Sequence, residues 1–137
     1  MADFSHTVLI KADAKMLFQF LTEVEMLPEI VPAVHDVHLH TDPPFGVGTS
    51  WTELPRRFFG FIPVPGRRTF TVTVYDKTKR RLVLVSEGTT FAYEAKKGGT
   101  RSCNLNLQIS NDDPKRLARD ERRYGDRAAL LLAFVDD

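Results

Sequence analysis

The sequence lacks most of the features that identify a protein's class at once. Its 137 residues contain one cysteine, Cys103, which excludes an internal disulfide framework and fits a reducing compartment. No apolar run approaches the ~18 residues of a membrane-spanning helix, and the N-terminus carries no charged-then-apolar targeting signal. The formal charge of +1 provides no overall field that would attract nucleic acid or an anionic membrane. We therefore expect a cytoplasmic protein without a membrane span or a nucleic-acid partner.

Signatures of catalysis are missing as well. The chain has no Ser-x-x-Lys, no Gly-x-Ser-x-Gly and no phosphate-binding glycine loop. Cys103 lies in an alternating apolar run without an identifiable base, which indicates a buried thiol rather than a reactive one. The basic groups Arg56-Arg57, Arg67-Arg68 and Lys79-Arg80-Arg81 are spread over separate turns, so we interpret them as solubilising rims. No catalytic residue and no cofactor is predicted.

Hydrophobic periodicity is what the sequence does contain, and its length predicts a single domain over residues 1–137. Two short helices are expected after the first strand, from Asp13 to Leu21 and around Met26 to Val31, where Pro32 ends the second. Seven segments with period-two alternation predict the strands of an antiparallel sheet. They are Phe4–Ala12, Val34–Thr41, Gly48–Leu54, Arg68–Tyr75, Arg81–Glu87, Thr90–Lys96 and Thr100–Ser110.

The last element predicted is one long helix from Asp113 to Val135, with Asp113 as N-cap and Pro114 at the first helical position. An apolar stripe follows helical spacing along it, and Glu121 interrupts this stripe. The stripe consists of Leu117, Tyr124, Ala128, Leu131 and Val135. Because the final two turns are apolar almost all round, we expect this half to be buried in the concavity of the sheet.

Three segments carry a resemblance to a known superfamily. They are the segment from Val8 into the strand that holds Val37, then Gly46-Val-Gly48, and then Gly98-Gly-Thr-Arg101. In this order they resemble the START-like or SRPBCC superfamily, often labelled polyketide cyclase/dehydrase-like. The resemblance covers nearly the whole chain and implies an α+β helix-grip fold, in which a curved seven-stranded sheet wraps the C-terminal helix. It also implies a cavity for an apolar or amphipathic ligand, although the superfamily includes binders, cyclases, hydroxylase domains and chaperone regulators.

The strand Thr100–Ser110 departs from that pattern. Relatives often have apolar residues where this chain has Ser102, Asn104 and Asn106, whereas here Cys103, Leu105, Leu107 and Ile109 alternate with them. Either the register is shifted by one residue or the cavity wall is polar on this strand. We favour an arrangement in which the Asn/Gln face meets solvent and the Leu/Ile face meets the helix.

Aromatic residues from several strands are the main evidence for a binding cavity. Most of them are expected to form core, and a subset, with residues of the last helix, is expected to line the pocket. The predicted cavity residues are Trp51, Phe59, Phe61, Phe70, Phe91, Tyr93, Leu105, Glu121, Tyr124 and Leu131. Glu121 could be a cavity acid with a raised pKa, but we favour its pairing with nearby arginines on a solvated face.

His35, His38 and His40 lie close to Asp36 and Asp42. Neighbouring side chains on one exposed strand supply two metal ligands at most, and no distant segment offers a third. We therefore predict a solvated face and no metal site.

The segment Phe58 to Val64 is too aromatic for a solvated loop and too rich in proline and glycine for a central strand, so we expect a gate at the cavity mouth. The function predicted is binding of a small hydrophobic or amphipathic molecule. One alternative is a cyclase/dehydratase in which Glu121 or Tyr93 handles protons. Another is an interaction module that docks through the aromatic segment. The oligomeric state is left open.

Overall fold

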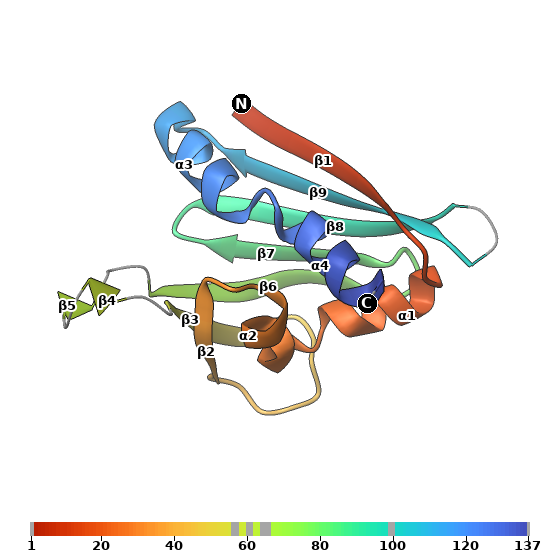
Figure 1. Ribbon diagram of the computed structural model, residues 1–137, viewed down its shortest axis with the longest axis horizontal. Coiled ribbons are helices and arrows are strands. Elements are labelled where there is room, and N and C mark those ends of the chain that lie inside the picture. Colours follow the sequence, from red (N-terminus) through yellow and green to blue (C-terminus); the bar gives the residue numbers. More distant parts are fainter. Residues whose placement is uncertain (1, 56–57, 60–61, 64–66, 99–100, 137) are drawn as a thin grey trace.

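The computed structural model describes residues 2–55, 58–59, 62–63, 67–98 and 101–136. Seven strands form one sheet in the order β1-β9-β8-β7-β6-β3-β2, and every neighbouring pair is antiparallel (Figure 1). The strands are β1 (Ala2–Ile10), β2 (Val34–Leu39), β3 (Ser50–Pro55), β6 (Arg68–Asp76), β7 (Arg81–Ser86), β8 (Thr89–Lys97) and β9 (Cys103–Asn111). The prediction of a seven-stranded antiparallel sheet is confirmed.

Short helices lead the chain from one edge of this sheet to the other. They are α1 (Ala14–Leu21), the single 3-10 turn η1 (Val24–Met26) and α2 (Leu27–Ile30). Leu17 and Phe18 of α1 are buried, because this face of the helix packs against β8. At the end of α2, Val31 is already extended and precedes Pro32, which cannot continue a helix. The helical segment therefore stops where β2 must begin.

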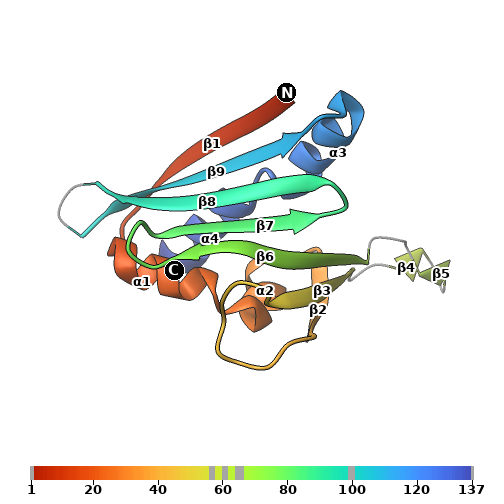
Figure 2. The same ribbon diagram turned by 180° about the vertical axis from the view of Figure 1, so that it is seen from behind.

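The C-terminal helical segment lies across one face of the sheet, and the view from behind shows it beyond the strands (Figure 2). Asp113 caps its start by accepting a hydrogen bond from the Lys115 backbone N–H at 3.0 Å, with Pro114 at the first position as predicted. The predicted single helix is in fact interrupted. It consists of α3 (Pro114–Tyr124) and α4 (Arg127–Asp136), separated by Gly125 and Asp126.

Close packing at Gly125 accompanies this interruption. A Cβ atom at this position would lie 2.5 Å from the Glu121 carbonyl oxygen and 3.2 Å from the Phe4 ring, so only glycine fits here. Asp126 then begins a new helical turn, because its carbonyl accepts from Leu130 N–H at 2.9 Å. On either side of the break, α3 and α4 both stay in contact with β1 and β9.

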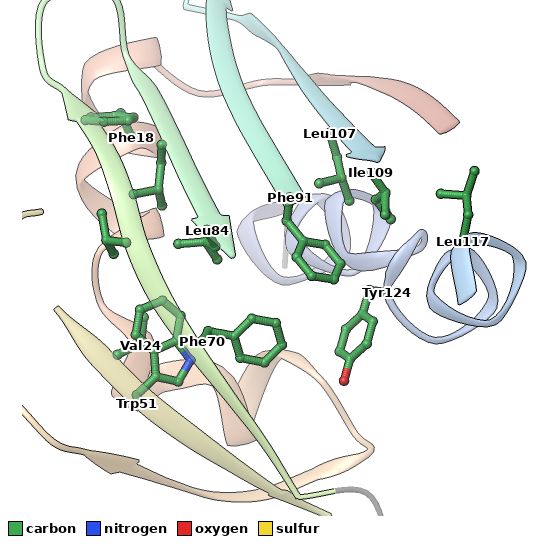
Figure 3. Packing of buried hydrophobic residues seen from close by; sticks show 12 residues of the cluster. Phe18, Val24, Trp51, Phe70, Leu84, Phe91, Leu107, Ile109, Leu117 and Tyr124 are labelled. Carbon is green, nitrogen blue, oxygen red and sulfur yellow. The ribbon is translucent and has the colours of Figure 1, made fainter. Parts of the chain in front are cut away.

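The core lies between the sheet and these helices. Cys103, Leu105, Leu107 and Ile109 of β9 are all completely buried, so the Leu/Ile face meets the helices as we favoured. On the opposite face of β9, Asn106 donates hydrogen bonds to the exposed hydroxyls of Ser5 and Thr7. Figure 3 shows how rings from β3, β6, β8 and α3 meet in the larger of two apolar clusters.

The aromatic segment between β3 and β6 contains a separate two-stranded hairpin, β4 (Phe58–Phe59) and β5 (Ile62–Pro63). Its backbone continues outward past the ends of β3 and β6 and lies far from α1 (Figure 1). Phe61 and the side chain of Phe59 lie outside the described residues. The predicted gate, and the docking function of this segment, therefore remain predictions.

Candidate functional site

A small cavity lies between the concave face of the sheet and the helices. Its volume is about 60 Å³, which is room for a few water molecules. Residues from three parts of the chain line it: the α1–β2 segment, the sheet and α4. The principal ones outside the α1–β2 segment are Trp51, Leu82, Leu84, Tyr93, Arg127 and Leu131.

A larger recess adjoins this cavity on the outer side of η1. It has a volume of about 410 Å³ and is bordered by η1 and by the loop that carries Pro43 and Phe45. Glu23 and Val24 line both spaces. Val24 is buried and Phe45 packs against the Trp51 ring with centroids 6.2 Å apart. The inner cavity and the recess therefore share part of their wall at η1.

The polar part of the cavity wall is built around an ion pair between β3 and α4. The Arg127 guanidinium donates to both Glu53 carboxylate oxygens, from Nη1 at 2.8 Å and from Nη2 at 2.5 Å. Burial alone would lower the pKa of Arg127, but the Glu53 carboxylate more than offsets this effect and the pKa lies above its ordinary value. Arg127 therefore stays charged, and Glu53 neutralises it locally.

Tyr93 of β8 brings a phenol to the same wall. Burial raises the pKa of Tyr93 to about 12; the Arg127 charge acts against this shift, while Glu53 adds to it. The hydroxyl is therefore protonated throughout the neutral pH range and can donate a hydrogen bond to a bound molecule. It is not a general base at neutral pH.

Two N–H groups of the cavity-lining residues have no hydrogen-bond partner within the described part of the chain. They are Trp51 Nε1 and Arg127 Nε, and both atoms are buried. The Trp51 ring itself is held by stacking on Phe70, with centroids 5.9 Å apart and planes inclined at 23°. In Figure 3 the indole nitrogen lies on the edge of the ring nearer to Phe70. Buried donors without a partner are uncommon in proteins, so these two N–H groups are candidates for hydrogen bonds to a bound molecule.

A second buried polar network joins β6, β8 and α3, and it was not predicted from the sequence. Arg68 of β6 and Asp120 of α3 form a bidentate ion pair, and Thr89 also donates to Asp120, at 2.6 Å. The guanidinium lies 5.1 Å from the Tyr124 ring centroid, and Arg127 lies 4.8 Å from the same centroid. Tyr124 therefore separates the two ion pairs, and its ring contacts both cations.

The expectation that Arg68 belongs to a solubilising rim is wrong, because its side chain is only 3% exposed. Arg68 can be buried because the Asp120 carboxylate neutralises its charge. Asp120 directly precedes Glu121, the residue that we had considered as a cavity acid. Asp120 is three positions after Leu117 and four before Tyr124, so helical spacing alone could have placed a carboxylate on the buried stripe. The helical spacing thus indicated a buried carboxylate, but we considered Glu121 for that role instead of Asp120.

The predicted cavity residues fall into several groups. Trp51, Tyr93 and Leu131 line the cavity. Phe70, Phe91 and Tyr124 pack edge-on against one another in the adjacent core, and Leu105 belongs to the second apolar cluster. The inclusion of Glu121 among the cavity residues is wrong, because its side chain is exposed on α3, on the solvated face that we favoured for it.

The histidines lie on the solvated face that the sequence predicted. His38 is 3.6 Å from Asp36, and His40 shares a hydrogen bond of 2.6 Å with the Thr52 hydroxyl. Among the described residues, no group of three or more His, Cys, Asp or Glu side chains could hold a metal ion. No helix in the same part of the chain is long and apolar enough to cross a membrane.

Comparison with known proteins rests on structure. No family model and no curated protein matches the sequence. Among solved structures, the di-domain ARO/CYC BexL from the BE-7585A biosynthetic pathway superposes with a TM-score of 0.70 at 18% identity over 98% of this chain. The chain spans only 45% of the BexL chain.

Two further structures match almost end to end. Norcoclaurine synthase from Thalictrum flavum, solved in complex with dopamine and hydroxybenzaldehyde, has a TM-score of 0.71 at 14% identity, with 98% of this chain and 86% of that chain covered. Ara h 8.0201 has a TM-score of 0.71 at 12% identity, with 99% of both chains covered. Together with the sheet and the C-terminal helices, these likenesses show that the chain has the START-like helix-grip fold.

Proposed function

We propose that the protein binds a small apolar or amphipathic molecule in the cavity between the sheet and α4. The observation that carries this proposal is the cavity itself, a mainly apolar chamber whose wall carries a few polar side chains, namely Glu23, Trp51, Tyr93 and Arg127. Pockets for small molecules commonly combine an apolar lining with a few placed polar groups. Binding of small molecules also fits the norcoclaurine synthase structure, which holds dopamine and hydroxybenzaldehyde.

The present volume of about 60 Å³ is smaller than most such ligands need. The recess of about 410 Å³ on the other side of Val24 provides the missing space. We propose that a ligand displaces η1 and occupies both spaces, with its polar end toward Arg127 and its apolar end toward Phe45. No nucleic acid is involved, and the cytoplasm is the proposed location.

A substitution that fills the cavity tests the proposed binding site. Leu131→Phe replaces a leucine of the cavity wall by a larger, aromatic side chain. Leu9→Phe makes the same change at a position that is 55% exposed. Titration with the neutral fluorescent probe N-phenyl-1-naphthylamine should show saturable binding to the parent and to Leu9→Phe, and at least tenfold weaker binding to Leu131→Phe. Circular dichroism confirms that both variants are folded. Equal affinity of all three proteins would contradict binding in this cavity.

A cyclase/dehydratase activity is the second candidate, because a protonated hydroxyl lines the same cavity. Tyr93, with its pKa of about 12, would donate a hydrogen bond or a proton to a substrate oxygen. Glu121 has no part in this version. Tyr93→Phe should then abolish turnover of a poly-β-ketone model substrate while leaving probe binding within about twofold. Unchanged turnover in this variant would exclude the role.

A further inference from the structure

The chemistry of the ligand's polar end can be inferred from the two unpartnered N–H groups of the cavity wall. Trp51 is 2% exposed, and its Nε1 has no acceptor among the described residues. Arg127 Nε is in the same situation, although Nη1 and Nη2 of the same guanidinium are both bonded to Glu53. A buried donor left without an acceptor is destabilising, because it has lost its hydrogen bonds to water. Both groups can only donate, so a bound molecule that satisfies them must offer an acceptor.

The charge around these donors favours an uncharged acceptor. The positive charge of Arg127 is already balanced by the Glu53 carboxylate, which is 5% exposed. A ligand carboxylate would enter a cavity whose cation, Arg127, is already paired with Glu53 and whose wall also carries Glu23, so it would be desolvated without a free counter-charge. A carbonyl oxygen has two lone pairs and no charge, so it can accept up to two N–H hydrogen bonds without this cost.

We propose that the ligand of this cavity is an apolar molecule with an uncharged carbonyl group, whose oxygen accepts hydrogen bonds from Trp51 Nε1 and Arg127 Nε. This inference rests on the proposed binding function and adds the ligand class to it. It does not require any reaction, because a ketone, an aldehyde or an ester would each provide the acceptor.

Three single-ring probes of nearly the same shape test the preference for a carbonyl group. Acetophenone carries a carbonyl, cumene replaces the carbonyl oxygen by a methyl group, and benzoate replaces the methyl group by a second, charged oxygen. Protein-observed NMR on the full chain measures their affinities and also follows the indole N–H signal. Trp51 is the single tryptophan, so this signal needs no assignment. We expect acetophenone to bind roughly tenfold more tightly than cumene and benzoate, which corresponds to about one to two net hydrogen bonds.

The indole N–H signal should move downfield with acetophenone and stay near its original position with cumene. Trp51→Phe keeps an aromatic ring but lacks the donor, so its preference for acetophenone over cumene should fall about threefold or more while cumene still binds. Leu9→Val is the control, because Leu9 is 55% exposed and lies outside the cavity, so this variant should leave that preference unchanged.

The outcomes separate this inference from the function on which it rests. Equal affinities for cumene and acetophenone would overturn the carbonyl inference and leave apolar binding intact. Tighter binding of benzoate than of acetophenone would overturn it in favour of an anion site. If none of the three probes binds the folded parent, both the inference and the proposed function fail. The parent measurements stand even if Trp51→Phe does not fold.

Discussion

Arg68 and Asp120 are 52 positions apart in the chain, yet they form a bidentate ion pair with distances of 2.6 Å (Nη1–Oδ1) and 3.1 Å (Nη2–Oδ2). Asp120 is fully buried and Arg68 nearly so. Arg68 also donates to the Ser86 hydroxyl and carbonyl, while Thr89 donates to Asp120. The pair therefore ties α3 to β6 and β7, and its hydrogen-bonding capacity is used almost completely.

Removing the Asp120 charge should strongly destabilise the protein. Asp120→Asn leaves the Arg68 guanidinium buried with only the exposed Glu87 carboxylate, 3.0 Å from Nε, to balance it. Breaking a buried pair in this way costs about 3–5 kcal/mol, and Glu87 favours the lower end of that range. Urea unfolding measures the loss. The control is Glu121→Gln on the exposed face of the same helix, which should change stability by less than about 0.5 kcal/mol. Similar small effects of both variants would contradict a structural role of the pair.

The Arg68–Asp120 pair should make the free energy of unfolding depend on pH in the acidic range. Burial acts to raise the pKa of Asp120, but hydrogen bonds from Arg68 and Thr89 outweigh it, so the folded-state pKa lies below the ordinary value of 3.8. A lowered pKa stabilises the fold above the unfolded-state value, and this contribution disappears as the pH falls through the folded-state pKa. The difference in unfolding free energy between the parent and Asp120→Asn should therefore be constant near neutral pH and shrink below about pH 4. A difference that stays constant down to pH 2 would argue against this assignment.

Gly125 should not tolerate a side chain. Gly125→Ala would place its Cβ atom 2.5 Å from the Glu121 carbonyl oxygen and 3.2 Å from the Phe4 ring. Overpacking of this kind costs about 1–3 kcal/mol, which thermal and urea unfolding can detect. Gly46→Ala is the matched control, because no atom lies within 4 Å of the added carbon. Equal stability of the two variants would show that the α3–α4 junction can relax.

Deleting Leu130–Asp137 should unfold the domain rather than merely open its cavity. Leu131 is buried in the second apolar cluster beside Ala128, and α4 packs on both β1 and β9. Each fully buried leucine contributes about 1.5–3 kcal/mol, against a total stability of about 5–15 kcal/mol. Circular dichroism during heating should show no cooperative transition for the truncated chain. A transition close to that of the parent would mean that the sheet is stable without this segment.

Local sequence patterns predicted the helix start and the strand faces correctly, because these features depend on residues that are close together in the chain. Asp113-Pro114 marks a helix start by capping geometry alone, and alternation identified the buried face of β9. The break at Gly125 was missed because a single glycine in a helical pattern is usually tolerated, and its contact with Phe4 arises only in the folded chain.

The site was less predictable because its polar groups meet across the sheet. Glu53 lies two positions after Trp51 on β3 and so shares its face of the sheet, but neither Glu53 nor Arg127 was among the predicted cavity residues. Their pairing over 74 positions is a tertiary contact without a local signal. Aromatic content did identify Trp51 and Tyr93 as cavity residues, because rings on an inward strand face must pack near any residual space.

The pairing of β1 with β9 has a consequence for how the protein is made. Ala2 pairs with Asn111 and Ile10 with Cys103, whereas the other strands of the sheet pair with sequence neighbours. During synthesis, the chain from β2 to β8 can form its hairpins as it emerges from the ribosome, but β1 must wait until β9 has appeared. Closing such a long loop is entropically costly, and contacts of this kind slow folding. β1 is therefore among the last strands of this sheet to gain its partner, and a chain that still lacks β9 presents β1 unpaired, a condition that favours aggregation.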